Sequence, residues 1–383
     1  MNFTEIFEKY WDLVIKIIDD TVTVVSSNTT EVLPGYPDPQ ISAFVTIARS
    51  IYPEIAFMKM GNTRPLFGAI VGYDGEYPLV KKRGTFTEER VEEVKLAIAT
   101  AFNEVDYKML RQLALHQRAQ NNEFLNAIIE EILVTPAKLT EAITILATKL
   151  LIDLFYGECQ YIDTLTGLGW EMSYMDAIPT SNRPLPLTGA ALWSSPATAK
   201  PLENLASHLQ TIYDNSRSMV EAVAFPSAVA LGLLNARDTK VKIIRSRGYM
   251  GALDEELMTS IARPTIQECR DWLSNEILTF SSGGIQVPQF LVSDAVYSPY
   301  RIDTIQNNLT PLDVPFLRPD GYVFLTKGII EGLFTPTATD EFRSPLAFFT
   351  KKENAPRRES TSIDTSFIGY CLNTKKLGWR KVI

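Results

Sequence analysis

The sequence predicts a mixed α+β fold in which strands and helices pack around one long apolar helix. Three patterns indicate this: a helical stripe at residues 135–157, a charged stretch at 62–105 with the pattern of a two-stranded arm, and a helix–strand–helix order at 199–235. Such a combination is typical of a mixed class with more than one structural unit. The length of 383 residues fits two or three units, or one domain with a large insertion.

The long helix is the clearest element. Thr135 and Pro136 suit the N-cap and the first helical position, and Gly157 stands where a left-handed C-terminal residue is wanted. Between them, apolar residues recur at steps of three and four: Leu139, Ile143, Leu146, Leu150 and Leu154. We therefore expect a separate helical segment from about Asn121 to Leu133, an interruption at Pro136, and then a helix that is covered on more than one side.

The segments before this helix divide into an N-terminal helix, a short helix and an arm. Residues 3–25 keep helical spacing, although the β-branched residues from Thr21 to Val25 favour an extended end. A second short helix is predicted from about Ser42 to Ile51. Residues 62–105 then pass a turn at Asp74-Gly75 and become strongly charged, which predicts a two-stranded arm or, in the simplest alternative, an ordinary solvated hairpin.

The segments after the long helix alternate between strands and helices. Strand patterns follow Gly157, and turn residues up to Pro186 suggest a boundary there. Further on, the sequence predicts a helix from Pro201, a buried strand within 220–225, a helix at 228–235, a helix at 266–278, and strands at 290–292 and 322–325.

Patterns that carry catalytic or metal chemistry are missing from the sequence. The two histidines, His116 and His208, have no Cys or carboxylate at metal-ligand spacing, so each is expected to be solvated or packed. No nucleophile elbow, P-loop or dinucleotide fingerprint is present. We therefore predict no catalytic residue, cofactor or metal. Three dispersed cysteines favour reduced thiols in a cytoplasmic setting, and neither a membrane span nor a signal peptide is predicted.

The charge is unevenly distributed along the chain. The net charge is −8, which argues against nucleic-acid binding by overall electrostatics. From Arg343 onward there are nine Lys or Arg and three Asp or Glu, a net +6, which leaves −14 for the first 342 residues. Within this basic end, we expect Lys351, Lys352, Arg357 and Arg358 to pair with acidic side chains. The alternative is a solvated loop without a partner.

The collinear order of several stretches resembles the major capsid proteins of tailed bacteriophages, specifically the lambda-type E family. The similarity covers the chain from about Pro65 to Thr339, although no single motif is diagnostic. The stretches are Pro65 to Val71, Lys81 to Thr87, Thr135 to Gly157, Gly169 to Met172, Leu187 to Ser194, Val223 to Leu231, Tyr322 to Leu325, and Gly332 to Thr337.

The resemblance implies a Hong Kong 97-type capsid fold, with a long spine helix, an extended β-hairpin loop, a peripheral domain and an inserted axial domain. The expected divisions are an N-terminal arm (1–61), the extended loop (62–105), the peripheral domain with the spine helix (106–186), the axial domain (187–328), and the return to the peripheral domain with a C-terminal segment (329–383). In the extended loop, the residues expected to contact other subunits are Lys81, Lys82, Arg83, Glu88, Glu89 and Glu92.

The same resemblance implies a structural protein that assembles with itself, as hexamers and pentamers, into an icosahedral phage head. The head would form in the bacterial cytoplasm and enclose double-stranded DNA without sequence-specific binding. A portal, a separate scaffolding protein and a cement or decoration protein are the further partners expected. In such a shell, the acidic partners of Lys351, Lys352, Arg357 and Arg358 are expected on a neighbouring subunit or on the cement protein. Two alternatives stay open: the shell protein of an encapsulin-type nanocompartment, and an unrelated cytosolic enzyme.

Overall fold

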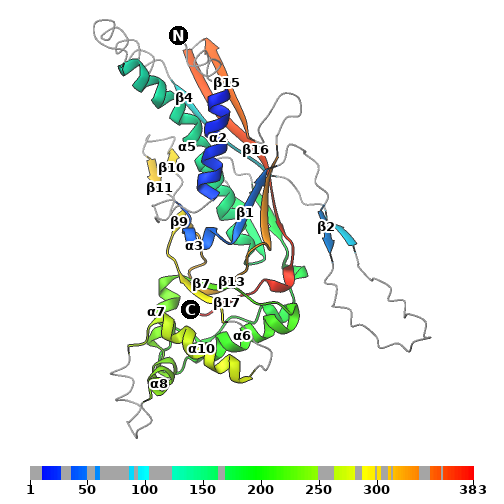
Figure 1. Ribbon diagram of the computed structural model, residues 1–383, viewed down its shortest axis with the longest axis vertical. Helices are drawn as coiled ribbons and strands as arrows, with labels where there is room; N and C mark the ends of the chain where they lie inside the picture. Colours follow the sequence, from blue (N-terminus) through cyan, green and yellow to red (C-terminus); the bar gives the residue numbers. More distant parts are fainter. Residues whose placement is uncertain are drawn as a thin grey trace, which may run out of the picture.

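A computed structural model provides the structure of the chain. It describes residues 11–26, 36–49, 57–60, 86–89, 94–102, 123–162, 169–248, 263–280, 287–297, 300–302, 309–311, 314–335, 346–354 and 357–383. Figure 1 shows an elongated molecule, with a long helix and a sheet in its upper part, a group of helices below, and an arm to one side.

The long helix, α5 (Glu123–Leu154), runs through Pro136 without a break. The predicted interruption and the predicted start at Thr135 are therefore wrong. A proline inside a helix costs about 3 kcal/mol, but fully burying one large apolar side chain contributes about 1.5–3 kcal/mol. Several such residues, including Leu139 and Ile143, are buried beyond the proline, so their packing outweighs the lost hydrogen bond.

The end of α5 agrees with the prediction. Gly157 has φ +83°, the left-handed conformation expected at a helix C-terminus. A Cβ at this position would also clash with the side chain of Ile178. Only glycine meets both demands, so the chain can turn there into β5 (Glu158–Ile162), which pairs with β6 (Gly169–Ser173).

The first sheet packs against α5. Its strand order is β1-β14-β16-β15, and β4 pairs along the other edge of β16. The strands are β1 (Val45–Arg49), β4 (Val94–Phe102), β14 (Ile330–Thr335), β15 (Ala347–Asn354) and β16 (Arg357–Cys371). The helix α2 (Trp11–Ser26) also packs on α5, so the helix is covered by α2 and by the sheet (Figure 1).

Two local predictions near the N-terminus are wrong. Residues 21–25 continue α2 as a helix, because Ile18 and Val22 belong to one buried stripe that packing maintains despite the β-branched composition. The expected helix at 42–51 is instead α3 (Pro39–Ser42) followed by β1. β1 pairs in parallel with β14, so tertiary pairing sets the conformation of this segment.

The second sheet lies between this part and the lower helices. Its strand order is β17-β13-β7-β8, with β7 (Ala222–Phe225), β8 (Gln289–Val292), β13 (Gly321–Leu325) and β17 (Trp379–Lys381). Ala222 and Ala224 face the core around α5, whereas Val223 and Phe225 face the core of the lower helices. Both faces are covered, which explains the continuous apolar run of β7.

The lower helices form the second core with this sheet. They are α6 (Pro201–Ser216), α7 (Ser227–Asn235), α8 (Arg237–Ser246) and α10 (Ile266–Phe280). The predicted helices at 201, 228–235 and 266–278 are thus present. Three further two-stranded pairs are short: β9 (Val296–Tyr297) with β12 (Val314–Pro315), β10 (Tyr300–Ile302) with β11 (Leu309–Pro311), and β2 (Phe57–Met60) with β3 (Phe86–Glu89). The described 3-10 turns are η1 (Met175–Ala177), η2 (Thr180–Asn182), η3 (Gly189–Ala191) and η4 (Thr374–Lys376).

Candidate assembly surfaces

An arm of two strands projects from the molecule, with β3 inside the predicted extended loop (62–105) and β2 just before it, in the segment predicted as the N-terminal arm. β2 and β3 pair antiparallel with one another, with Met58 opposite Glu88 and Phe57 opposite Glu89. Figure 1 shows β2 well clear of both sheets. Glu88 and Glu89 therefore lie on a strand that points away from the rest of the chain, whereas Lys81, Lys82, Arg83 and Glu92 lie outside the described residues.

Residues 94–102, at the end of the predicted extended loop, belong to the first sheet and not to the projecting arm. β4, which spans 94–102, pairs with β16 over its whole length, from Val94 opposite Phe367 to Phe102 opposite Glu359. This stretch is therefore a strand of the first sheet. Similarly, β17 pairs with β13 in the second sheet, although it lies in the segment expected to return to the peripheral domain.

The four basic residues near the C-terminus come together at one end of the β15–β16 hairpin. Lys352 lies opposite Glu359 and Arg358 opposite Glu353. Opposite charges across a strand pair contribute about 0.2–1 kcal/mol. The other two, Lys351 and Arg357, lie opposite Ser360 and Asn354. Two of the four predicted basic residues, Lys352 and Arg358, therefore have an acidic residue of the same chain opposite them on the neighbouring strand.

An arginine joins the end of α5 to the second sheet. The Arg318 guanidinium donates to Glu158 Oε1 at 2.9 Å and lies 4.6 Å from the ring centre of Tyr156 and 5.0 Å from that of Trp379. The Arg318 backbone N–H donates to the Tyr156 hydroxyl at 2.9 Å. Burial raises the pKa of Tyr156 well above its usual range, so the hydroxyl stays protonated. Sequence reasoning missed Arg318, because its partners lie about 160 residues before it and 60 after it.

His208 is a buried connector between α6, β13 and η2. Its Nε2 donates to the Asn182 carbonyl at 2.9 Å, and the Tyr322 hydroxyl donates to its Nδ1, also at 2.9 Å. Burial lowers the pKa of His208 to about 4, which the bond to Asn182 opposes and the charge of Arg380 reinforces. The imidazole is therefore neutral near pH 7. Of the two environments that the sequence left open, the packed one is found.

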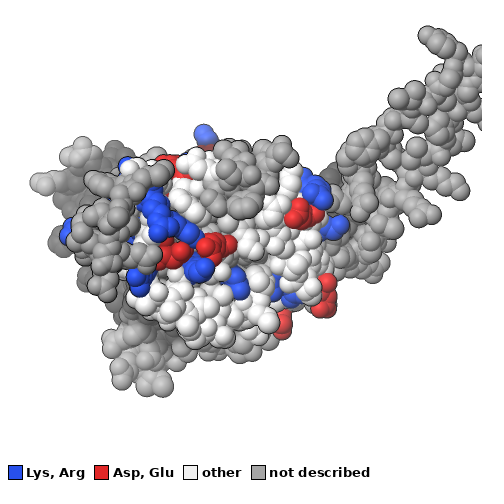
Figure 2. All heavy atoms as spheres, turned by 90° about the horizontal axis from the view of Figure 1, so that it is seen from below, with Lys and Arg blue, Asp and Glu red and all other residues white. Residues whose placement is uncertain are grey.

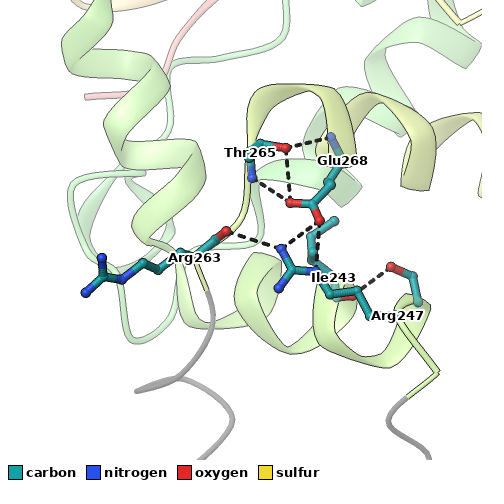
Figure 3. A network of polar contacts seen from close by, with 6 residues as sticks. Ile243, Arg247, Arg263, Thr265 and Glu268 are labelled. Carbon is teal, nitrogen blue, oxygen red and sulfur yellow. Dashed lines mark hydrogen bonds and ion pairs between the residues drawn. The ribbon is translucent and has the colours of Figure 1, made fainter.

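A polar network joins α8 to α10 at the lower end (Figure 3). The Thr265 N–H donates to Glu268 Oε2 at 2.8 Å, and the Glu268 N–H donates to Thr265 Oγ1 at 3.2 Å, a capping box at the start of α10. Arg247 Nε donates to Glu268 Oε1 at 2.8 Å. Although burial opposes it, hydrogen bonds from Thr265 and Arg247 hold the pKa of Glu268 below its usual value.

Charges of both signs are mixed on this lower face. Figure 2 shows basic side chains beside acidic ones, with an uncharged area between the groups. On α8, the Lys242 Nζ lies 2.8 Å from carboxylate oxygens of Glu203 and Asp238. Such pairs neutralise one another locally, so the described part of this face has no large surface of a single charge.

The described residues do not assemble a reactive centre of a familiar kind. Among them, no group of three or more His, Cys, Asp or Glu is placed to hold a metal ion. All three cysteines are free and buried. Burial, with the charge of Glu268, raises the pKa of Cys269 to about 12, so its thiol stays protonated. His116 lies outside the described residues. No described helix is both long and apolar enough to cross a membrane.

Comparison with solved structures decides the fold. The chain superposes on a crystal structure of a prophage protein from E. coli CFT073, provisionally described as a capsid protein, with a TM-score of 0.50. The match covers 97% of this chain and 98% of the other, at 11% identity. The chain has the Hong Kong 97-type capsid fold. In the terms of the predicted fold, α5 is the spine helix.

Two further solved structures are weaker likenesses. The procapsid of satellite phage P4, solved with its size-determination protein, matches 96% of the chain at 7% identity and a TM-score of 0.44, covering 99% of that chain. The capsid of cyanophage P-SCSP1u matches 93% of this chain at 9% identity and a TM-score of 0.43, covering 90% of the cyanophage chain. Neither adds to the fold assignment. No protein-family model and no curated protein matches the sequence.

Proposed function

We propose that this protein is a major capsid protein that assembles with itself into the icosahedral head of a tailed phage, enclosing packaged double-stranded DNA. The observation that carries the proposal is the capsid fold over nearly the whole chain. The β2–β3 arm supports it, because a pair of short strands held away from its own body is suited to contact with another subunit.

The finer expectations remain part of this proposal. Membership of the lambda-type E family rests on the collinear stretches quoted from the sequence. Hexamers and pentamers, a portal, a separate scaffolding protein and a cement protein follow from that membership, as does a place in the virion after assembly in the bacterial host. The five-part division of the chain is likewise proposed, with β4 and β17 paired in sheets as described.

The four basic residues of the β15–β16 hairpin retain their proposed role. Lys351, Lys352, Arg357 and Arg358 pair with carboxylates and not with packaged DNA. The strand register adds a source for two of these carboxylates within the same chain, namely Glu353 and Glu359. A neighbouring subunit or a cement protein would then supply partners for the remaining charge.

Sedimentation of the purified full chain tests the proposal. A capsid protein is expected to yield closed particles of many subunits, and particles from infected or induced cells should hold nuclease-resistant double-stranded DNA. Particles that hold a protein cargo and no DNA would support the nanocompartment alternative instead. A chain that stays a small oligomer under all assembly conditions would contradict both shell functions.

A further inference from the structure

Residues 316–324 carry the chain from one core to the other. Phe316 and Leu317 are buried in the core around α5, whereas Tyr322 and Phe324, on β13, are buried in the core of the lower helices. Arg318 lies between these two pairs. A side chain at this crossing can contact both parts of the molecule, so the contacts of Arg318 bear on how the two parts are held together.

Arg318 is held from both sides of the crossing. On the side of α5, its guanidinium donates to Glu158 at 2.9 Å and lies 4.6 Å from the ring centre of Tyr156. On the side of the second sheet, it lies 5.0 Å from the ring centre of Trp379 on β17. An arginine can bond a carboxylate and stack on aromatic rings at the same time, because its planar fork has donors in the plane and faces that are free to stack.

Trp379 is oriented by these ring contacts. Its Nε1 is buried and has no hydrogen-bond partner among the described residues, although a buried Trp N–H usually has one. The indole instead contacts the Tyr156 ring edge-on, with ring centres 5.9 Å apart, and the Arg318 guanidinium. We call Arg318, Tyr156, Glu158 and Trp379 the Arg318 clamp. Because the indole has no such hydrogen bond, the clamp orients it against the end of α5.

A second ion pair near the crossing does not join the two parts. Lys381 Nζ lies 2.9 Å from an Asp320 carboxylate oxygen. Asp320 directly precedes β13, and Lys381 lies on β17 opposite Gly321 of β13. This pair therefore holds neighbouring strands of the second sheet together, whereas the Arg318 clamp connects that sheet to the end of α5.

We infer that Arg318 is a positioning residue for assembly, which fixes the orientation of the second sheet against the end of α5 and thereby the curvature at which the shell closes. This inference rests on the proposed self-assembly. The two cores carry different surfaces of one subunit, and a closed shell repeats the same contacts in every copy. A small rotation between the two parts would therefore recur at each contact and change the size of the shell that closes.

Particle diameters of the full-length Arg318→Met variant, measured by electron microscopy, test the inference. Methionine keeps an unbranched apolar side chain but lacks the charge and the fork. We expect a folded subunit with unchanged circular dichroism, and about a tenfold larger share of particles of abnormal diameter, since the stacking and the bond to Glu158 are both lost. A residue with only a structural role would lower the yield and leave the diameter of the particles that form unchanged.

Lys381→Met is the matched control. It removes one positive charge near the same crossing but leaves the Arg318 clamp intact, so its particles should keep the diameter of the unsubstituted shell. Arg318→Lys takes the place of Arg318→Met if the latter does not fold. It retains the charge without the planar fork, so it should raise the share of abnormal particles about threefold.

Uniform particles of normal diameter from Arg318→Met, or from Arg318→Lys in its place, would overturn the inference while leaving the proposed function intact. Equal shares of abnormal particles from Lys381→Met and the Arg318 variant would also overturn it, because loss of any charge near the crossing would then suffice. Failure of both Arg318 variants to fold would assign Arg318 to folding and overturn its role in positioning. An unsubstituted chain that forms no closed shell would instead refute the proposed function.

Discussion

Gly332 on β14 lies directly opposite Gly369 on β16, and both lie beneath Leu151 of the spine helix. A Cβ at Gly332 would come within 2.8 Å of a Leu151 methyl group, and one at Gly369 within 3.3 Å. Two glycines in register thus let the spine helix approach the sheet closely. The close packing of α5 on the sheet depends on this pair.

Gly332→Val should therefore destabilise the subunit. Overpacking a buried site typically costs about 1–3 kcal/mol, and chemical denaturation of the unassembled subunit measures it. Ala97→Val, on the exposed side of β4 in the same sheet, is the control and should change stability by about 0.5 kcal/mol or less. Adding Leu151→Ala should relieve part of the strain, so the double variant should be more stable than the two separate losses predict. Strict additivity would contradict this packing.

Stability should fall as the solution is acidified, through His208. Its folded pKa of about 4 is below the unfolded value of about 6.5, so the unfolded chain binds the proton first. The stabilisation is complete above about pH 6.5 and is lost between there and about pH 4, on the order of 3 kcal/mol. Denaturation across this range should give a shallower pH dependence for His208→Gln. Parallel curves for the two proteins would show that His208 does not titrate as described.

Charge reversal in the predicted extended loop should block assembly without unfolding the subunit. Glu88→Lys, Glu89→Lys and Glu92→Lys together change the charge by +6, and opposite charges at a subunit boundary guide association and fix register. We expect normal circular dichroism and at least a tenfold lower yield of particles.

The control for this triple variant changes the same charge elsewhere. Asp20, Glu171 and Asp176 are exposed, and their replacement by Lys should leave the particle yield within about twofold, since most surface substitutions have small effects. Equal yields from the arm variant and the control would remove the arm from the assembly interface.

Neutralising the basic hairpin should weaken particles and not their DNA content. Exposed ion pairs contribute about 0.2–1 kcal/mol each, so the four substitutions Lys351→Gln, Lys352→Gln, Arg357→Gln and Arg358→Gln matter only through repetition over many copies. Particles should assemble, dissociate at a lower denaturant concentration, and package the same length of DNA. A structure of the unsubstituted particle in which these four side chains face the interior, away from any protein carboxylate, would refute their pairing with acidic residues.

Local patterns in the sequence predicted elements whose own residues determine their form. The end of α5 followed from Gly157, and the order of α6, β7 and α7 followed from periodicity and from Pro201 and Pro226. The errors lie where tertiary contacts override local preference. Pro136 remains inside α5, and residues 45–49 become a strand only because β14 pairs with them.

The residues that join distant elements of the fold could not be predicted from local sequence patterns. Arg318, Asn182 and Tyr322 act through partners far along the chain, and a single arginine or asparagine carries no periodic signal. For β4, the alternation from Lys95 to Ile98, with Leu96 buried between exposed neighbours, was a strand signal within the stretch expected as a loop. Of the predicted arm contacts, the register places Glu88 and Glu89 on β3, and the rest of that set lies outside the described residues.

Electron microscopy of the purified full-length protein, after assembly, tests the central claim most directly. A major capsid protein with this fold should form closed icosahedral shells, and a reconstruction should resolve hexamers and pentamers of one subunit with α5 as the spine of each. A uniform population of small soluble oligomers, with no closed shell under any assembly condition, would contradict the claim.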